Sequence, residues 1–367
     1  MEGFYMNMRT SVYFLIIACC TFMIAGRQYH DCGDQGCNHG HREIESELRP
    51  SALLHSPDYQ QPAENPEIKI ISQEKVLSGP FMAPRFSADG QYIILTGDNY
   101  QGLWIAPRNG SQMPVKISDD FMAGWRPVTT RDSELIYRTA QYDKNTGDIT
   151  YIVQRYDLNS GEKEEVYRGR NENVYPPQLS RDGEILYILR DGEILVKPGR
   201  KGREVSGLSE RDEGFSYSDG GRVWYRQIGK DKPAEISGGR EACGGEVPSP
   251  CGRYIAFLSG DLNAILIHDL ETGEEVNIGE GSNLAWYPDG SLLLYDVTSD
   301  DGYYIRESDL FSVRPDGTDR QRVTFDPDTA YFNPSWSSEG NHIICEDVLT
   351  GEIHLFEVER QGKGGRR

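Results

Sequence analysis

The chain repeats one short pattern of hydrophobic and polar positions along most of its length. In each copy, a brief segment with an aromatic or aliphatic residue meets a tight polar turn, and an apolar strand follows. Short apolar runs bounded by Gly, Asp and Ser are typical of β-strands joined by hairpins. The pattern therefore predicts an all-β chain built from one recurring unit.

Seven copies of this motif align. Four are clear, at residues 84–90 (PRFSADG), 177–183 (PQLSRDG), 284–290 (LAWYPDG) and 333–340 (NPSWSSEG). Three are more divergent, at residues 126–132, 215–220 and 247–252. The copies begin about 30 to 50 residues apart, which is the spacing of propeller blades. A sheet of this kind cannot bury both faces alone, so the units are expected to stack in a ring.

These copies predict a β-propeller of seven blades, each with four antiparallel strands, over residues 67–360. Six blades is the alternative, if the short unit around Phe215 merges with a neighbour. Residues 67–78 have the pattern of an outer strand that precedes the first full motif. We expect this strand to complete the blade begun by residues 330–360 and so to close the ring.

The motif copies resemble the TolB-type propeller repeat, in which an aromatic-Ser-Pro-Asp-Gly turn precedes an apolar strand. The stretch 317–343 (GTDRQRVTFDPDTAYFNPSWSSEGNHI) carries this resemblance most fully, and it extends over about residues 67–360. The resemblance implies the fold and leaves the function open. TolB also has an α/β domain before its propeller, and the same repeat forms the propeller of prolyl-oligopeptidase-like peptidases. Neither that domain nor a Gly-x-Ser-x-Gly elbow is recognisable here, so we expect a free-standing propeller.

The N-terminal residues have a different composition. Residues 11–26 (SVYFLIIACCTFMIAG) are apolar or small, and this run is shorter than the ~20 residues that cross a bilayer. We interpret residues 1–26 as a secretory signal cleaved near Ala25 or Gly26. The alternatives are a bacterial lipobox ending at Cys19, which would give a lipid-anchored protein, and an uncleaved anchor. All three place the rest of the chain outside the cytoplasm, in the periplasm or outside the cell.

Residues 27–66 are polar and lack the apolar residues of a core, so they are expected to form a linker, and residues 361–367 a basic tail. Thiolates and imidazoles bind zinc or copper. The linker holds five such residues, which are a candidate zinc site: His30, Cys32, Cys37, His39 and His41. A disulfide between the two linker cysteines is the alternative, because disulfides form in oxidising compartments.

The other cysteines lie in the repeats. Cys243 and Cys251 are close in sequence and form a second candidate disulfide. Cys345 lies in an apolar strand, where we expect it to act as a small hydrophobic residue.

A second candidate metal site lies between two strands of the second unit. Asp143, Asn145 and Asp148 surround Gly147, and oxygen ligands around a glycine turn can bind calcium. The calcium-loop pattern is incomplete because it lacks a terminal Glu, so a polar hairpin turn is the alternative. The sequence calls for no cofactor beyond these possible zinc and calcium ions.

The charge balance restricts the partners. The chain has 38 basic and 58 acidic residues, a formal net charge of −20. Such a surface repels phosphate backbones, which argues against a nucleic-acid partner. It also disfavours docking on anionic lipid, so membrane contact is expected only through the N-terminal segment.

These features favour an exported scaffold that binds an envelope protein, a peptide or a glycan and has no catalysis of its own. Recognition is expected in the longer loops, 139–149 and 297–308. The five tryptophans fall in the repeats, and we expect most to pack between blades and some to line the channel mouth. The alternative is a metal-dependent polysaccharide lyase-like enzyme, or another carbohydrate-active enzyme, with its site in the propeller channel. The repeat is similar to that of oligogalacturonide lyases. The histidines of the repeats, His268, His342 and His354, lie on separate predicted strands.

Overall fold

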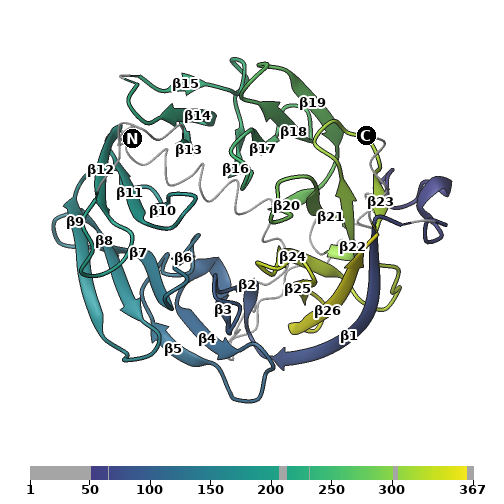
Figure 1. The fold of residues 1–367 in the computed structure, drawn as a ribbon, viewed down its shortest axis with the longest axis horizontal. Helices are drawn as coiled ribbons and strands as arrows, with labels where there is room; N and C mark the ends of the chain where they lie inside the picture. Colours follow the sequence, from purple (N-terminus) through teal and green to yellow (C-terminus); the bar gives the residue numbers. More distant parts are fainter. Residues whose placement is uncertain (1–50, 65, 206–212, 231, 301–304, 362–367) are drawn as a thin grey trace, which may run out of the picture.

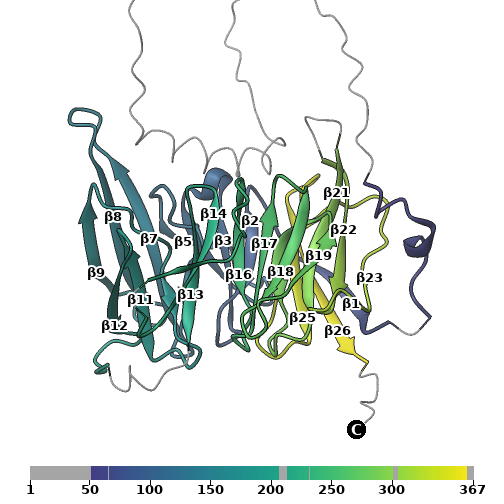
Figure 2. The same cartoon turned by 90° about the horizontal axis from the view of Figure 1, so that it is seen from above.

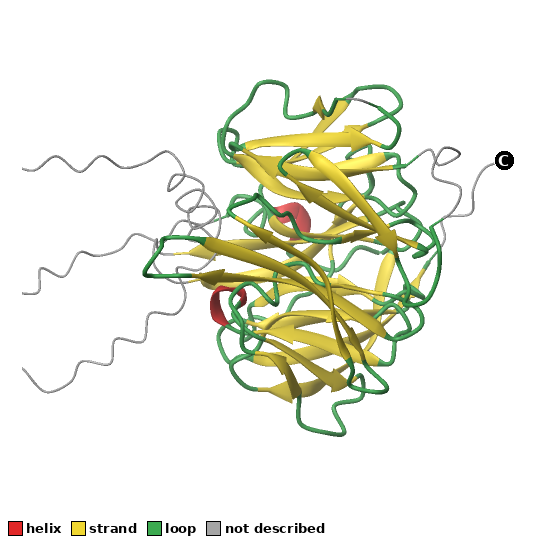
Figure 3. Cartoon of the chain, turned by 90° about the vertical axis from the view of Figure 1, so that its left-hand side faces the viewer, coloured by secondary structure: helices red, strands yellow, loops and turns green. Residues whose placement is uncertain are grey.

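The computed structural model describes residues 51–64, 66–205, 213–230, 232–300 and 305–361, and these form seven antiparallel sheets arranged in a ring (Figure 1). The predicted seven-bladed propeller is therefore confirmed. Apart from two short 3-10 segments, η2 (Pro57–Tyr59) and η3 (Asp98–Tyr100), the described secondary structure is all strand (Figure 3). No helix among the described residues is long and apolar enough to span a membrane.

The blades are numbered in the order in which they follow one another along the chain. The strands of each blade are given from the innermost described strand outward. Blade 1 contains β2 (Met82–Phe86), β3 (Tyr92–Thr96), β4 (Leu103–Pro107) and β5 (Val115–Ser118). Blade 2 contains β6 (Val128–Thr129), β7 (Glu134–Tyr142), β8 (Ile149–Asp157) and β9 (Lys163–Arg170). Blade 3 contains β10 (Gln178–Leu179), β11 (Ile185–Arg190) and β12 (Glu193–Pro198). Blade 4 contains β13 (Gly214–Asp219), β14 (Arg222–Gln227) and β15 (Ala234–Glu235).

The remaining blades each have four described strands. Blade 5 contains β16 (Cys243–Pro248), β17 (Tyr254–Ser259), β18 (Ala264–Asp269) and β19 (Glu275–Gly279). Blade 6 contains β20 (Ser282–Trp286), β21 (Leu293–Asp300), β22 (Ile305–Val313) and β23 (Gln321–Arg322). Blade 7 contains β24 (Tyr331–Trp336), β25 (His342–Asp347), β26 (Glu352–Arg360) and, outermost, β1 (Ile68–Ser78).

The hydrophobic core is divided among the seven contacts between neighbouring blades. Strand β3 shows why, because its successive side chains point to opposite faces. Ile93 and Leu95 pack against blade 7, whereas Ile94 packs against blade 2. Each of the other blade contacts has its own cluster of buried residues. A strand buried on both faces needs an almost continuous apolar run, which is the run seen after each turn motif.

The turn that recurs in the copies of the motif has a clear structural cause. The Ser87 hydroxyl donates to the Asp89 carboxylate over 2.5 Å and accepts from the Tyr92 N–H over 3.0 Å. Gly90 takes a positive φ of 70°, a conformation that glycine adopts without strain. Ser180 and Asp182 repeat this arrangement in blade 3. The aspartates of the motif therefore shape hairpin turns.

One divergent copy of the motif does not occupy the position that the alignment gave it. Residues 215–220 lie in β13 and in the turn to β14, whereas the Asp-Gly turns of the clear copies follow the innermost strands. Arg181, in a turn after an innermost strand, donates its N–H to Glu213, so β13 starts at the face where that turn lies. It therefore runs in the direction of a second strand. Its Asp219-Gly220 turn matches the motif in sequence only.

The ring closes through β1, as the sequence predicted. This strand pairs with β26 from Ile68 opposite Arg360 to Ser78 opposite Glu352. At the start of β1, the side chain of Gln321 accepts the N–H of Glu67 over 2.6 Å and donates to the carbonyl of Ile68 over 2.8 Å.

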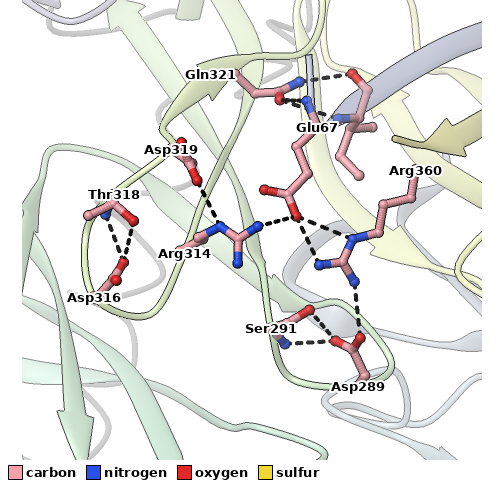
Figure 4. A network of polar contacts seen from close by, with 10 residues as sticks. Glu67, Asp289, Ser291, Arg314, Asp316, Thr318, Asp319, Gln321 and Arg360 are labelled. Carbon is pink, nitrogen blue, oxygen red and sulfur yellow. Dashed lines mark hydrogen bonds and ion pairs between the residues drawn. The ribbon is translucent and has the colours of Figure 1, made fainter. Parts of the chain in front are cut away.

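A charged cluster reinforces the closure (Figure 4). The Glu67 carboxylate, which is 2% exposed, accepts from Arg314 and Arg360, each over 2.9 Å. Arg360 also contacts Asp289 over 3.0 Å. We call Glu67, Arg314, Arg360 and Asp289 the closing clasp, because they join the first strand, the last strand and blade 6.

The end of the predicted linker is packed on the propeller. Leu54 is 3% exposed and belongs to the core cluster between blades 5 and 6, and the Tyr59 ring meets Phe311 edge to face at 5.6 Å. Ser51 donates its hydroxyl to Glu280 over 2.6 Å. The polar composition of this segment did not predict such contacts. Residues 1–50 and 362–367, with the signal and the basic tail, lie outside the described residues.

The predictions for the cysteines had different outcomes. Cys243 and Cys251 are both free and lie near opposite ends of β16, so the prediction of a disulfide between them was wrong. Cys345 is fully buried in β25, as expected, and burial raises the pKa of its thiol well above the usual value. Cys32 and Cys37 lie outside the described residues.

Candidate functional site

The innermost strands share an irregularity that the sequence did not predict. In four blades, the register between the first two strands shifts at a bulge. The residues at this point have positive φ, namely Ala83, Gly245, Asn283 and Asn333, and Arg126 has the same conformation before β6. Such bulges bend a strand and re-aim its side chains. Here they lie on the innermost strands, around the centre of the ring, which we call the channel (Figure 1).

Two of these bulges are bound by a carboxylate of the preceding blade. The N–H of Ala83 donates to Glu346 over 2.9 Å, and the N–H of Asn333 donates to Asp296 over 3.1 Å. The side chain of Asn333 also donates to Glu346, over 2.9 Å. Buried carboxylates therefore connect blades 6, 7 and 1 beside the channel.

Asp296 is fully buried and has no cation among its described contacts. Ser282 donates to one of its oxygens over 2.5 Å, and Asn283 donates to the other over 2.8 Å. Desolvation raises the pKa of Asp296 to about 6, against the opposing effect of these hydrogen bonds. This carboxyl group therefore titrates just below neutral pH.

An ion pair crosses the ring. Arg126 precedes β6 in blade 2, and Glu246 lies on β16 in blade 5; their Nη1 and Oε1 atoms are 2.6 Å apart. Arg126 also donates to the backbone carbonyl of Glu246 over 2.8 Å, and Ser218 donates to the same carboxylate. Glu246 is 5% exposed, so Arg126 neutralises a buried charge.

Two aromatic rings lie beside this ion pair. Tyr100 and Trp125 meet edge to face at 4.5 Å, and the Arg126 guanidinium lies 5.8 Å from the Trp125 ring centroid. Tyr100 ends η3, and Gly124 donates its N–H to the Tyr100 carbonyl over 3.2 Å. A Cβ atom at Gly124 would lie 1.9 Å from the Thr96 hydroxyl, so only glycine allows this approach. Aromatic and Arg side chains are the residue types enriched at binding hot spots.

Arg85 completes the group, on the innermost strand β2. Its side chain is exposed, and its guanidinium makes no hydrogen bond or ion pair with another described residue. The pKa of Arg85 is lowered, first by desolvation and then by repulsion from Arg126. Tyr100 acts in the opposite direction. We call Arg85, Tyr100, Trp125, Arg126 and Glu246 the channel cluster.

The backbone of this region is strained. Asn99, Tyr100, Met122 and Arg126 all have φ between 49° and 63°, which non-glycine residues seldom adopt. Strained residues persist where the surrounding structure holds them, and they gather at functional sites. The same face of the ring carries η3, the projecting β7–β8 hairpin and the ends of β21 and β22 (Figure 2).

The predicted calcium ligands lie at the tip of the β7–β8 hairpin. Asp143 accepts the N–H of Asn145 over 2.8 Å. The Asp148 carboxylate accepts a hydrogen bond from Asn171 over 2.6 Å and pairs with Arg170. These contacts lower the pKa of Asp148, and the hydrogen bond from Asn171 has the largest effect. In the structure, these side chains therefore serve the turn, and calcium binding stays a prediction.

The other predicted site residues are dispersed. His268 is on β18 in blade 5, whereas His342 and His354 are on β25 and β26 in blade 7. Within the described ranges, no three His, Cys, Asp or Glu side chains are grouped to hold a metal ion. The candidate zinc ligands His30, Cys32, Cys37, His39 and His41 lie outside those ranges.

The tryptophans differ in their surroundings. Trp286 and Trp336 are buried between blades, and Trp104 and Trp224 pack against core clusters. Trp125 is the one in the channel cluster. The sequence could not single it out, because its place depends on Gly124 and on the pairing of Arg126 with a residue three blades away.

The structure of this chain is similar in fold to several solved structures. No family model and no curated protein matches the sequence. TolB from Acinetobacter baumannii is 13% identical, with a TM-score of 0.42; the match covers 78% of this chain and 57% of that one. The β-propeller domain of Cps50 (Swd1) from Myceliophteria thermophila is 12% identical, with a TM-score of 0.47, and covers 80% of this chain and 100% of the domain.

An oligogalacturonate lyase in complex with manganese is also similar in fold. It is 15% identical, with a TM-score of 0.41, and the match covers 76% of each chain. The chain spans 57% of the length of the TolB structure.

Proposed function

We propose that this protein is an exported propeller scaffold that binds an envelope protein, a peptide or a glycan through the face bearing the channel cluster, without catalysis of its own. The observation that carries the proposal is the channel cluster itself. It places two aromatic rings and two guanidinium groups beside the channel, on a backbone held in strained conformations. Rigid scaffolds commonly present recognition residues in this way.

Export is the second part of the proposal, and it rests on the sequence. The apolar run of residues 11–26 ends in small residues, which suits a cleaved secretory signal. A protein delivered to the envelope meets proteins, peptides and glycans there, and the strongly acidic chain argues against nucleic acid.

The test is quantitative capture of a partner from the native cell envelope by the full-length protein after chemical cross-linking. Trp125→Ala is expected to lower capture of a specific partner at least severalfold, because hot-spot aromatic residues carry much of the binding energy. The matched control is Met113→Ala, which removes an exposed apolar side chain (78% exposed) from the β4–β5 turn, away from the channel. Equal capture by both variants and the wild-type protein would contradict the proposal. Turnover of an envelope polysaccharide by the purified protein would favour the enzyme alternative.

A further inference from the structure

Residues 51–60 precede the closing strand and belong to none of the described sheets. The ring closes through β1, which begins at Ile68, so the sheets are complete without this segment. Its short helix η2 lies at the outer edge of the ring, beside blade 6 (Figure 1). Residues 61–64, which lead from it toward β1, are exposed. We call residues 51–60 the strap, because they lie across blades 5 and 6.

The strap provides hydrogen bonds to polar groups that the blades leave without a donor. The Glu280 carboxylate follows β19 and accepts the Ser51 hydroxyl over 2.6 Å and the Leu53 N–H over 2.5 Å. Ser299 is fully buried on β21, and its hydroxyl accepts the N–H of Ser51 over 2.9 Å. Among the described residues, only the strap donates a hydrogen bond to either side chain. Buried polar groups are normally hydrogen-bonded, so Glu280 and Ser299 form a site that needs an occupant.

The apolar contacts of the strap add two anchors. Leu54 completes the core cluster between blades 5 and 6, and among the described residues no other core cluster includes a side chain that precedes β1. The Tyr59 ring packs on Phe311 of β22, and Arg322 donates to the Tyr59 carbonyl over 3.2 Å. We call Glu280, Ser299, Phe311 and the core cluster around Leu54 the strap site.

A single turn of the chain sets the spacing of these contacts. The N–H of His55 donates to the Ser51 carbonyl over 3.3 Å, and the N–H of Leu54 donates to the Ser51 hydroxyl over 3.0 Å. This turn places a hydroxyl group on Glu280 and, three positions later, a leucine in the core cluster. All of these hydrogen bonds lie within five residues, so a short peptide can form the same turn. The strap site therefore recognises a local sequence pattern.

The strap is also suited to leave its site. Only Ser51 and Leu54 of its ten residues are buried. Segments with few buried side chains open locally, at a lower free energy than the whole domain. A second copy of the chain is disfavoured as the source of a replacement, because the net charge of −20 makes identical molecules repel one another. The replacement is therefore a segment of a different, less acidic polypeptide.

We propose that the strap is an intramolecular ligand, and that the strap site binds a segment of a partner polypeptide when the strap opens. The segment has a hydroxyl residue at its start, leucine three positions later and an aromatic residue five positions after the leucine, as Ser51, Leu54 and Tyr59 do. This inference goes beyond the proposed function, because the strap site contains no residue of the channel cluster.

The test measures binding of a fluorescently labelled peptide with the sequence of residues 51–60 to the full-length protein by fluorescence anisotropy. The variant Leu54→Ala/Tyr59→Ala has lost both anchors of its own strap, so it should bind the peptide. The wild-type protein should bind it about tenfold or more weakly, because the tethered strap competes at an effective concentration on the order of millimolar. The matched control Leu349→Ala removes an exposed leucine from the β25–β26 turn and should bind like the wild-type protein.

Further changes locate the binding. Adding Glu280→Gln to the double variant should weaken binding about ten- to hundredfold, the usual effect of losing hydrogen bonds to a charged group. Adding Trp125→Ala instead should leave binding unchanged, whereas it lowers capture of the channel partner. Binding that persists with Glu280→Gln, or that is lost with Trp125→Ala, would show that the peptide binds elsewhere and would overturn the proposal. A peptide with alanine in place of Leu54 that binds as well as the original would do the same.

Hydrogen exchange of the wild-type protein tests the opening of the strap directly. The amides of Leu53 and Leu54 should exchange faster than those of β21, and equal protection would show that the strap opens only when the whole protein unfolds. A large fall in the unfolding midpoint of the double variant, or no peptide binding by a variant that keeps its midpoint, would also refute the proposal. A wild-type dimer in light scattering that Leu54→Ala abolishes would make a second copy the occupant and overturn the assignment of a different partner.

Discussion

Replacing Asp296 with asparagine should stabilise the protein near neutral pH. In the folded protein its pKa is about 6, compared with an ordinary value of 3.8. A difference of about 2 pH units corresponds to about 3 kcal/mol, at about 1.4 kcal/mol per unit. Between pH 4 and 6, the folded state binds more protons than the unfolded state, so the free energy of unfolding falls as the pH rises. By about pH 7, the buried group is mostly charged and that loss is nearly complete.

Asparagine fits the hydrogen bonds of this site. Its amide oxygen can accept from Asn283 and from the N–H of Asn333, as one carboxylate oxygen of Asp296 does. Its amide nitrogen can donate to Ser282, in place of the proton that a neutral carboxyl group would carry. The Asp296→Asn variant therefore resembles the protonated wild-type protein at every pH. We expect a stability close to that of the wild-type protein at pH 4 and higher by up to about 3 kcal/mol at pH 7.

The assay is urea unfolding at pH 4, 5, 6 and 7 at fixed ionic strength, followed by tryptophan fluorescence. The matched control is Asp316→Asn, in an exposed turn where hydrogen bonds from Thr318 lower the pKa of Asp316. This group contributes stability above its unfolded pKa and loses it as the pH falls, so its removal should have the opposite sign. A difference between Asp296→Asn and the wild-type protein that does not change with pH would refute the reasoning.

Four further predictions concern other parts of the structure. Glu67→Gln leaves the two arginines of the closing clasp without their buried partner, so the melting temperature should fall and proteolysis near β1 should increase; unchanged proteolysis would show that the clasp does not hold the strand. Arg126→Gln leaves Glu246 buried with one hydroxyl donor, which should destabilise the fold by about 3 kcal/mol in urea unfolding. Leu54→Ala should expose residues 51–60 to protease while the main unfolding midpoint stays nearly constant, since local segments open separately from the core. Purified full-length protein analysed for metal by mass spectrometry should lose any zinc when Cys32 is changed to serine, and zinc retained by that variant would contradict the linker site.

The fold was predictable because its signals are local. Each Asp-Gly turn carries its own geometry, as Ser87 and Asp89 show, and each following apolar run marks a strand buried on both faces. The closing strand β1 was also predictable from a local signal. Its sequence has the pattern of an outer strand, but it precedes the first full motif, so its partner had to come from the last blade. The copy at Phe215 was misplaced because an Asp-Gly turn also forms between second and third strands.

The site was not predictable because its contacts join distant repeats. Arg126 and Glu246 are 120 positions apart, and the motif gives no information on which blades face one another across the channel. Arg85 has the strand position that Val128 and Ser335 have in other blades. The sequence shows its charge but does not show that the charge of Arg126 acts on it.

The pairing of β1 with β26 also sets the order in which the protein can fold. The contacts of Glu67 with Arg360 join residues 293 positions apart, so they form only after the whole chain is available. Any shorter length of chain leaves two blade faces without neighbours and their apolar residues in water. Native-like contacts of such long range are slow to form, because the entropy of closing a large loop is lost before the contacts stabilise it. A nascent chain is therefore prone to association with other chains until its last strand is made, and it depends on remaining unfolded or protected until then.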